Sequence, residues 1–529
     1  MSRSGVRDDS IFTLVGAGAL AVAAGALVAF DARYHEFWRD EVHAALLSAS
    51  VPWHRFLLAK RIEGPPFMLD LLTLLLRRVF SPEWTLLLGG AIGYAVLLFG
   101  TYRCILSICC RRVASLVMTA LLAGTYVYAY EFGIVIRAYG LGAGFALLTN
   151  AYLRDALRQG TRRPVLLGTL AGGICAISST HGATFAAGSF VAFALLAVWR
   201  DRGIRRLWLT LGALPLFVLA AYLALPFPGR STDLNADEHR PHELFARLAL
   251  QAISGGFTPQ DWWVTASFGN PGTLDIIALL RHWALFGVAL GVAYSVAVRL
   301  VDVYGVYGEY RPVLLYDLLA IGLGFLPLLE IVINHYWGSP RHHAFFGIPV
   351  VVTLAGWGLQ RPFGAPRIAK WMSAGALVFG SPWFLFQWIL CVRDIDLDVR
   401  LPFSDSKAAA AMLPPGAHVV GESLTMQEGY LFWRPGIVMR GGDCAGRTLG
   451  ATSFDSAWHS RVPLAPLVRA ECASAPDRTY YSGPKGSVSP LDACLRLLRT
   501  ATPPSEQLRA DERFDLWQVD CACSEQVPR

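Results

Sequence analysis

Charged residues are scarce in this chain, since Asp, Glu, Lys and Arg make up 16% of its 529 residues. A soluble domain carries about 25% charged residues, so the composition excludes an ordinary soluble protein over most of the length. The sequence also lacks a low-complexity tract, a strong internal repeat and the Cys/His spacing of a zinc finger. No nucleotide-binding glycine loop is evident. The run Gly140-x-Gly142-x-Gly144 lies inside an apolar segment, where small residues favour close helix packing.

Hydrophobic residues dominate what is present, at 54% of the chain, and the mean hydropathy is +0.43. The formal charge of +7 could suggest a nucleic-acid partner. The basic residues instead form short clusters between apolar segments, which is the pattern of the positive-inside rule. We therefore predict an integral membrane protein with no nucleic-acid partner.

The apolar segments predict an all-α polytopic bundle of about eleven transmembrane helices. The first segment, 11–30, is long enough to span a bilayer, and no clear A-x-A site marks it as a cleaved signal peptide. The predicted spans are 11–30, 84–102, 113–128, 138–153, 165–179, 183–199, 208–227, 274–298, 313–333, 345–359 and 371–391.

The distribution of Lys and Arg predicts a cytoplasmic N-terminus. With that orientation the cytoplasmic pieces hold 18 Lys and Arg residues in 64 positions, whereas the outer pieces before residue 392 hold 12 in 122. Segment 66–80 is apolar but short and ends in Arg77-Arg78, so we expect a surface helix in the first outer loop. If it spanned, every later loop would change sides and the basic residues would lie on the wrong face.

Residues 392–529 are predicted to form a soluble extracytoplasmic domain, separate from a catalytic membrane domain at 1–391. Its short β-like runs, such as 418–421 and 436–439, and a helix-like run at 491–498 favour a small α/β or α+β fold. Five of the ten cysteines lie in this tail. Outside the cytoplasm they would form one or two disulfides, with one thiol left over. These cysteines are Cys444, Cys472, Cys494, Cys521 and Cys523.

Two adjacent carboxylates, Asp40 and Glu41, follow the first apolar segment. Carboxylates at the mouth of a membrane bundle are costly to hold near hydrocarbon, so they indicate a function. One of them could act as a general base on an acceptor hydroxyl, or as a metal ligand. The structural alternative is that they cap a surface helix starting near Val42, where carboxylates favour the helix dipole.

The carboxylate pair belongs to an ordered set of features. Trp38-x-Asp40-Glu41 follows the first span, an apolar helix led by Pro65-Pro66 comes 25 residues after Asp40, and a bundle of about eleven spans follows. From residue 11 to about 391, this set resembles the GT-C superfamily. These polytopic glycosyltransferases use polyprenyl-phosphate sugars, and lipid A aminoarabinose transferases and protein O-mannosyltransferases are relatives. The resemblance implies that Asp40 is the catalytic carboxylate, with Glu41 beside it, and that Trp38 orients the loop or stacks on lipid or sugar.

The second motif departs from the superfamily pattern. Some relatives place a Lys or His before the proline, whereas this sequence reads Glu63-Gly64-Pro65-Pro66. Glu63 would therefore line the substrate pocket. Lys60 and Arg61 lie close enough in the sequence to bind phosphate in place of the missing residue.

A second constellation lies where the third and fourth spans meet on the outer side. It comprises Glu131, Arg137 and Tyr139. Many GT-C sequences have a Glu and an Arg-x-Tyr here, so the resemblance implies that Arg137 binds the donor phosphate, which a guanidinium matches with two hydrogen bonds. The structural alternative is an Arg137–Glu131 ion pair that stabilises the turn.

A third constellation is basic and aromatic and lies between the ninth and tenth spans, at 335–343. The superfamily commonly has an Arg late in the bundle that contacts the donor phosphate, and Arg341 fits that position. His335, His342 and His343 would line the pocket. They also permit a divalent metal, although no zinc-type Cys/His pattern supports one. His181, in a short outward turn, is either structural or a further pocket residue.

Together these features predict a glycosyltransferase of the bacterial inner membrane. A polyprenyl-phosphate sugar would be the donor and a lipid, glycan or protein the acceptor. Asp40 would be the base, and the configuration at the anomeric carbon would invert. The main alternative is a transporter or flippase of lipid-linked sugars. Transporters usually hold their ionisable residues near mid-membrane, whereas here they gather at one face.

Overall fold

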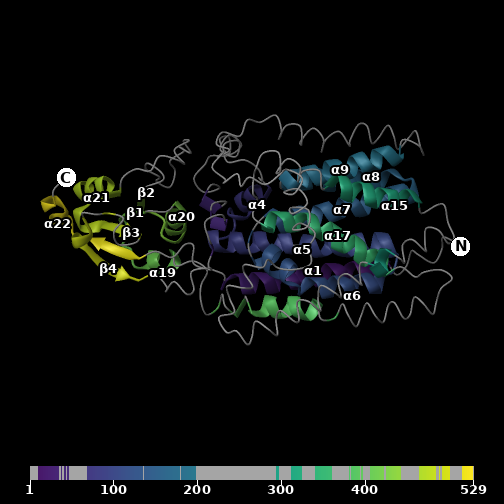
Figure 1. Ribbon diagram of the computed structural model, residues 1–529, viewed down its shortest axis with the longest axis horizontal. Coiled ribbons are helices and arrows are strands. Elements are labelled where there is room, and N and C mark those ends of the chain that lie inside the picture. The colour runs from purple at the N-terminus through teal and green to yellow at the C-terminus, as the bar shows by residue number, and fades with distance from the viewer. Residues whose placement is uncertain are drawn as a thin grey trace.

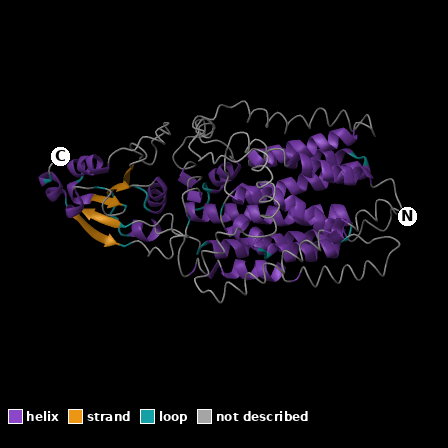
Figure 2. Ribbon diagram, in the orientation of Figure 1, coloured by secondary structure: helices purple, strands orange, loops and turns teal. Residues whose placement is uncertain are grey.

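The computed structural model is a helical bundle with a small α/β unit at one end (Figure 1). The described residues are 10–34, 37, 41–42, 45–46, 68–134, 136, 138–178, 180–197, 293–296, 311–324, 340–359, 381, 383–393, 395–396, 399, 406–421, 424–441, 464–483, 488, 491–500 and 515–527. Strands occur only in the C-terminal unit, residues 406–527, within the described ranges (Figure 2).

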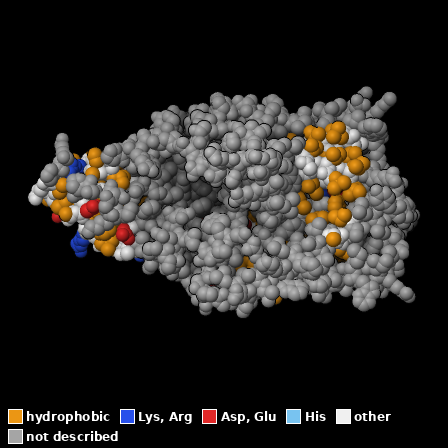
Figure 3. All heavy atoms as spheres, in the orientation of Figure 1, with side chains coloured by type: hydrophobic (Ala, Val, Ile, Leu, Met, Phe, Trp, Pro, Cys, Tyr) orange, Lys and Arg blue, Asp and Glu red, His pale blue; other side chains and the backbone are white. Residues whose placement is uncertain are grey.

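The bundle contains helices α1 (Ser10–Ala32), α4 (Met68–Leu76), α5 (Pro82–Cys109), α6 (Arg112–Ala123), the π-helix η2 (Val127–Ile134), α7 (Ala138–Gln159), α8 (Arg162–Ser178), α9 (Thr180–Ala197), α15 (Arg311–Gly324) and α17 (Pro340–Gly358). The helix α5 is the longest of them and lies at the centre, against α1, α7 and α17 (Figure 1). On the face in Figure 3, the described side chains of the bundle are mostly hydrophobic. Lys, Arg, Asp and Glu side chains gather over the C-terminal unit instead.

Local sequence explains both ends of α5. Ser81 is the N-cap and accepts a hydrogen bond from the Trp84 N–H at 3.4 Å. Pro82 occupies the first helical position, where a missing N–H costs nothing, and Glu83 favours the helix dipole. The helix ends where Cys110 adopts the left-handed conformation, with φ of 55°, and donates its N–H to the Leu106 carbonyl.

Helices α5 and α7 approach each other through glycine, as the sequence predicts. A Cβ atom placed on Gly144 would lie 2.6 Å from the Leu97 nitrogen, and one placed on Gly100 would meet the Gly144 carbonyl oxygen. Backbones this close exclude any larger side chain.

Two helices, Val15–Ala32 and Pro82–Cys109, are long and apolar enough to cross a membrane within the described part of the chain. A third crossing is formed if α6 and η2 count as one broken span, since they meet at a bend of 66°. The predicted span 113–128 therefore corresponds to two helical pieces and not to one continuous helix. The helix α6 ends at Ala123 and a π-helix follows after the break. The span at 208–227 and most of 274–298 lie outside the described residues, so the total of eleven stays a prediction.

Several predicted boundaries shift. The helix α7 continues to Gln159, so Arg154 belongs to the bundle and not to a cytoplasmic loop. The helix α17 begins at Pro340, five residues before the predicted start, because proline suits the first helical position. The helix α9 begins at Thr180, which puts His181 in a helix and not in a turn. The apolar segment 66–80 contains α4, whose nine residues are too few to span a bilayer.

The C-terminal unit is built on a five-stranded mixed sheet of order β2-β1-β3-β5-β4. Strands β1 (His418–Gly421), β2 (Val438–Gly441) and β3 (Thr479–Ser482) are parallel, while β4 (Leu495–Arg499) and β5 (Leu516–Val519) pair antiparallel at one edge. The helices are α19 (Ser406–Ala411), α20 (Leu424–Trp433), α21 (Leu464–Ser474) and α22 (Cys521–Gln526), with short 3-10 turns η4 (Pro476–Arg478) and η5 (Leu491–Cys494).

The predicted helix at 491–498 is wrong. Only a 3-10 turn forms at 491–494, and Leu495–Arg499 pairs with β5. Strand pairing here overrides the local helix-like pattern. The predicted domain boundary at 391/392 falls inside the apolar helix Trp383–Arg393, so that division stays a prediction.

Two disulfides join the last elements of the C-terminal unit, Cys472–Cys521 and Cys494–Cys523. They confirm the expectation of one or two bridges in the tail. Cys444 lies outside the described residues.

Candidate functional site

The loop after α1, predicted to be the first outer loop, touches the bundle at Glu41, one of the two predicted catalytic carboxylates. Its Oε1 accepts a hydrogen bond from the backbone N–H of Ile136 at 2.6 Å, and its side chain is fully buried. The contact ties the Glu41 side chain to the backbone of Ile136, the residue that directly precedes Arg137 in the sequence. The fixed carboxylate of Glu41 fits a positioning role for this residue better than a catalytic one.

A second contact holds the same loop four residues later. Arg77, just after α4, donates from Nη1 to the Ala45 carbonyl at 3.5 Å, which is long for a hydrogen bond. Partial burial lowers the pKa of the Arg77 guanidinium. Arginine nevertheless stays protonated, because its ordinary pKa lies far above neutral pH. The residue that follows α4 therefore contacts the loop that carries Asp40.

The π-helix η2 ends two residues before Ile136. It carries Glu131, whose side chain is half-buried. Short π-helical stretches inside helical segments are frequent at functional sites. Phe132 packs edge-on against Tyr139 of α7, with ring centroids 6.2 Å apart. The structure thus brings Glu131 and Tyr139, both predicted pocket residues, onto two adjoining elements.

The other predicted residues differ in what is described of them. Arg341, His342 and His343 lie in the first turn of α17, and His181 is the second residue of α9. Only their backbones are described. The predicted residues outside the described ranges are Trp38, Asp40, Lys60, Arg61, Glu63, Arg137 and His335. Across the ranges that are described, no group of three or more His, Cys, Asp or Glu side chains is arranged to hold a metal ion.

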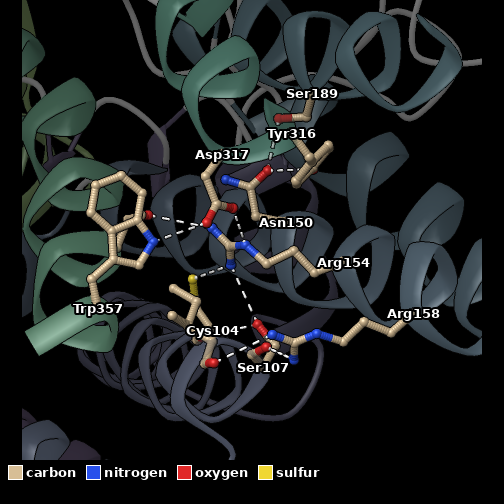
Figure 4. Close-up of polar contacts among 11 residues, drawn as sticks. Cys104, Ser107, Asn150, Arg154, Arg158, Ser189, Tyr316, Asp317 and Trp357 are labelled. Carbon is tan, nitrogen blue, oxygen red and sulfur yellow. Dashed lines mark hydrogen bonds and ion pairs between the residues drawn. The ribbon is translucent and has the colours of Figure 1, made fainter. Parts of the chain in front are cut away.

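A buried ion pair that the sequence reasoning missed lies at the far end of α7 (Figure 4). Arg154 donates from Nε to Asp317 of α15, and the two side chains are 1% and 0% exposed. The Nε1–H of Trp357 donates to the other Asp317 oxygen at 3.1 Å. The sequence did contain a signal for this ion pair, because a charged residue within an apolar segment marks a paired or functional position. Asp317 falls in the predicted span 313–333.

Further hydrogen bonds surround this ion pair. The Arg154 guanidinium donates to Cys104 Sγ at 3.1 Å, to Ser107 Oγ at 3.3 Å and to Thr353 Oγ1 at 3.3 Å. Beside it, Asn150 Oδ1 accepts from Ser189 at 2.9 Å and from Tyr316 at 2.8 Å. These contacts join α5, α7, α9, α15 and α17 in one network (Figure 4).

The ion pair lies far from the first outer loop. Arg154 comes 15 residues after Tyr139 on one continuous helix, a rise of about 22 Å at 1.5 Å per residue. With both Asp317 oxygens and all three Arg154 nitrogens engaged, the pair is suited to fixing helix positions. The end of the bundle that carries Glu41, Glu131 and Tyr139 is accordingly the candidate active site.

No family model matches the sequence, and no curated protein matches it. Solved structures do match. ArnT from Cupriavidus metallidurans in the apo state aligns with a TM-score of 0.51 at 15% identity, over 97% of this chain and 99% of that one. The same protein bound to undecaprenyl phosphate gives a TM-score of 0.49 at 14% identity, over 94% and 97% of the two chains. The Archaeoglobus fulgidus oligosaccharyltransferase, in complex with Zn and sulfate, gives 0.46 at 13%, over 80% and 62%. At such identities a likeness establishes the fold alone, and this chain shares the fold of the ArnT structure in the apo state.

Proposed function

We propose that the protein is a GT-C-type glycosyltransferase that moves a sugar from a polyprenyl-phosphate donor to an acceptor at the extracytoplasmic membrane face. The hydrogen bond between the Glu41 side chain and the Ile136 N–H carries the proposal, because these two residues are the sequence neighbours of Asp40 and Arg137. The fold shared with ArnT supports it.

In the proposed reaction, Asp40 accepts the proton of the acceptor hydroxyl as its oxygen attacks the anomeric carbon. The bond from that carbon to the phosphate oxygen breaks, and the polyprenyl phosphate leaves with the electron pair. Inversion follows from attack opposite the leaving group. Negative charge develops on the phosphate, where fixed cations in a partly dry site are most effective. Arg137 and Arg341 are the proposed cations, with Lys60 and Arg61 as further candidates.

The geometry of the chain supports an extracytoplasmic C-terminal unit. The helix α1 has 23 residues, about 34 Å at 1.5 Å per residue, and leads directly to Phe37, which stacks on the C-terminal unit. The start of α1 is thus a membrane thickness away from that unit. Two disulfides also favour an oxidising compartment. A cytoplasmic N-terminus and an outer active site agree with both observations.

A transporter would use ionisable residues within the membrane, and the buried Arg154–Asp317 pair is a candidate of that kind. Its hydrogen bonds are satisfied within the bundle, which favours a structural role. No observation specifically favours transport.

The test is native mass spectrometry of the purified protein with a panel of polyprenyl-phosphate sugars. The experiment compares wild type with the variants Arg137→Ala and Arg341→Ala. The matched control is Arg163→Ala, since Arg163 is exposed and lies near the start of α8. We expect one lipid-linked sugar to bind wild type and the control but to bind both other variants weakly. Absence of binding across the panel, in protein shown to be folded, would overturn the proposal.

A further inference from the structure

An aromatic cluster joins the first outer loop to the C-terminal unit. Its members are Phe37 of the loop and Phe432 and Trp433 at the end of α20. The rings of Phe37 and Trp433 are stacked, with centroids 5.8 Å apart and an interplanar angle of 2°. Phe432 meets Phe37 edge-on at 5.9 Å and Trp433 edge-on at 4.8 Å. Phe37 is 1% exposed, so the cluster removes it almost completely from solvent.

The cluster also joins two hydrophobic cores. Phe37 and Phe432 belong to the main core of the bundle, although Phe432 comes from the C-terminal unit. Trp433 packs against that core and against the core of the C-terminal unit, and Leu46 of the first outer loop does the same. The loop is therefore held between the two parts of the molecule.

The ammonium group of Lys407 lies over the Trp433 ring. The Lys407 Nζ lies 4.3 Å from the centroid of the Trp433 ring and 3.5 Å from Glu83 Oε1 in the first turn of α5. Lys407 and Glu83 are 50% and 40% exposed, and ion pairs this exposed contribute little. The stacked aromatic rings are the main contact.

The position of the cluster along the chain gives it a catalytic consequence. Asp40 is three residues from Phe37, so their Cα atoms are at most about 11 Å apart even in an extended chain. On the other side of Asp40, Glu41 and Ala45 are bonded to the bundle. A displacement of Phe37 is therefore passed to the catalytic carboxylate. A misplacement of about 1 Å can cost roughly 10²-fold in rate.

We infer that Trp433 is a positioning residue. By stacking on Phe37 it holds the first outer loop, so the C-terminal unit contributes to the placement of the catalytic residues. For its catalytic consequence the inference rests on the proposed function, whereas the loop contact can be tested without it.

The first experiment measures hydrogen exchange of segment 37–46 in the full-length protein. The variants are Trp433→Ala, which removes the stacking ring, and Trp433→Phe, which keeps an aromatic ring. Trp84→Ala is the control, an exposed tryptophan in the first turn of α5. We expect exchange in 37–46 to rise about tenfold in Trp433→Ala, as loss of an aromatic pair with its buried area implies. Exchange in Trp433→Phe and the control should stay near wild type. Equal exchange in all four proteins would overturn the inference.

The second experiment measures transfer with the donor identified by mass spectrometry. We expect Trp433→Ala to lower kcat by about tenfold or more with donor affinity unchanged, and Trp433→Phe to restore most of it. Phe37→Ala combined with Trp433→Ala should do no further harm, because the two residues act through one contact. Additive losses, or a loss of donor affinity alone, would overturn the positioning role. If wild type binds no donor, the proposed function fails, and hydrogen exchange still decides whether the loop is held.

Discussion

Glu41 and Ile136 are separated by 95 residues, yet the carboxylate of the first accepts the backbone N–H of the second at 2.6 Å. This single contact divides the roles of the adjacent carboxylates. Glu41 is buried and bound to the backbone, so Asp40 is the residue proposed to meet substrate.

We expect Asp40→Asn and Glu41→Gln to have very different effects on transfer. Loss of a general base lowers the rate by about 10²–10⁴-fold. Glutamine keeps an acceptor oxygen for the Ile136 N–H, so Glu41→Gln should lose about tenfold or less. Steady-state kinetics with bound donor verified by mass spectrometry measures both. Equal losses in the two variants would contradict the division of roles.

The glycine contact between α5 and α7 should tolerate no larger side chain. A Cβ on Gly144 would lie 2.6 Å from the Leu97 backbone nitrogen, which cannot move aside as a side chain could. We expect Gly144→Ala to destabilise the protein by about 1–3 kcal/mol, as overpacking typically does. Thermal unfolding in detergent measures the effect. Gly18→Ala in α1 is the control, because nothing lies within 4 Å of its Cβ position. A normal melting temperature for Gly144→Ala would mean that the helices are farther apart.

Removing one member of the Arg154–Asp317 pair should destabilise the bundle without affecting the donor site. Asp317→Ala leaves a buried guanidinium unpaired, at a cost of about 3–5 kcal/mol. The double variant Arg154→Met with Asp317→Leu should recover much of that loss, because no charge remains buried. Asp155→Asn should destabilise the protein less than Asp317→Ala. Asp155 pairs with Arg103 at 3.1 Å, and both of these side chains are partly exposed.

For this pair, chemical or thermal unfolding reports stability, and donor affinity by mass spectrometry reports the site. If the destabilisation of the double variant equals the sum for Arg154→Met and Asp317→Leu measured singly, then hydrogen bonds of the network, and not the paired charges, stabilise this region.

Reduction should destabilise the C-terminal unit and leave the bundle folded. The bridges close loops of 49 and 29 residues, and chain entropy assigns each about 4 kcal/mol when taken alone. Because the loops overlap, the joint effect should be smaller than the sum. Limited proteolysis with and without reductant, followed by mass spectrometry, locates the cleavage. Cutting in the bundle first, or no change at all, would contradict the prediction.

Sequence patterns anticipated the features that depend on nearby residues. The helices α1 and α5, the glycine contact of α7 and the small sheet with its disulfides all follow from hydropathy, residue size and cysteine content. Boundaries were less certain. Residues such as Arg154 look like the start of a loop until their partner is known, and the strand at 495–499 depends on pairing with β5.

By itself, the sequence determined the membrane character of the chain, its helical class and the two adjacent carboxylates in the loop after the first span. Hydropathy and charge act additively over about 20 residues, so they can be read along the chain. Only the tertiary structure decided that Glu41 meets Ile136, that Arg154 meets Asp317 and that Phe37 stacks on Trp433. Each of these pairs joins segments distant in the sequence, and their meeting depends on helix rotation and packing, which one-dimensional periodicity does not fix.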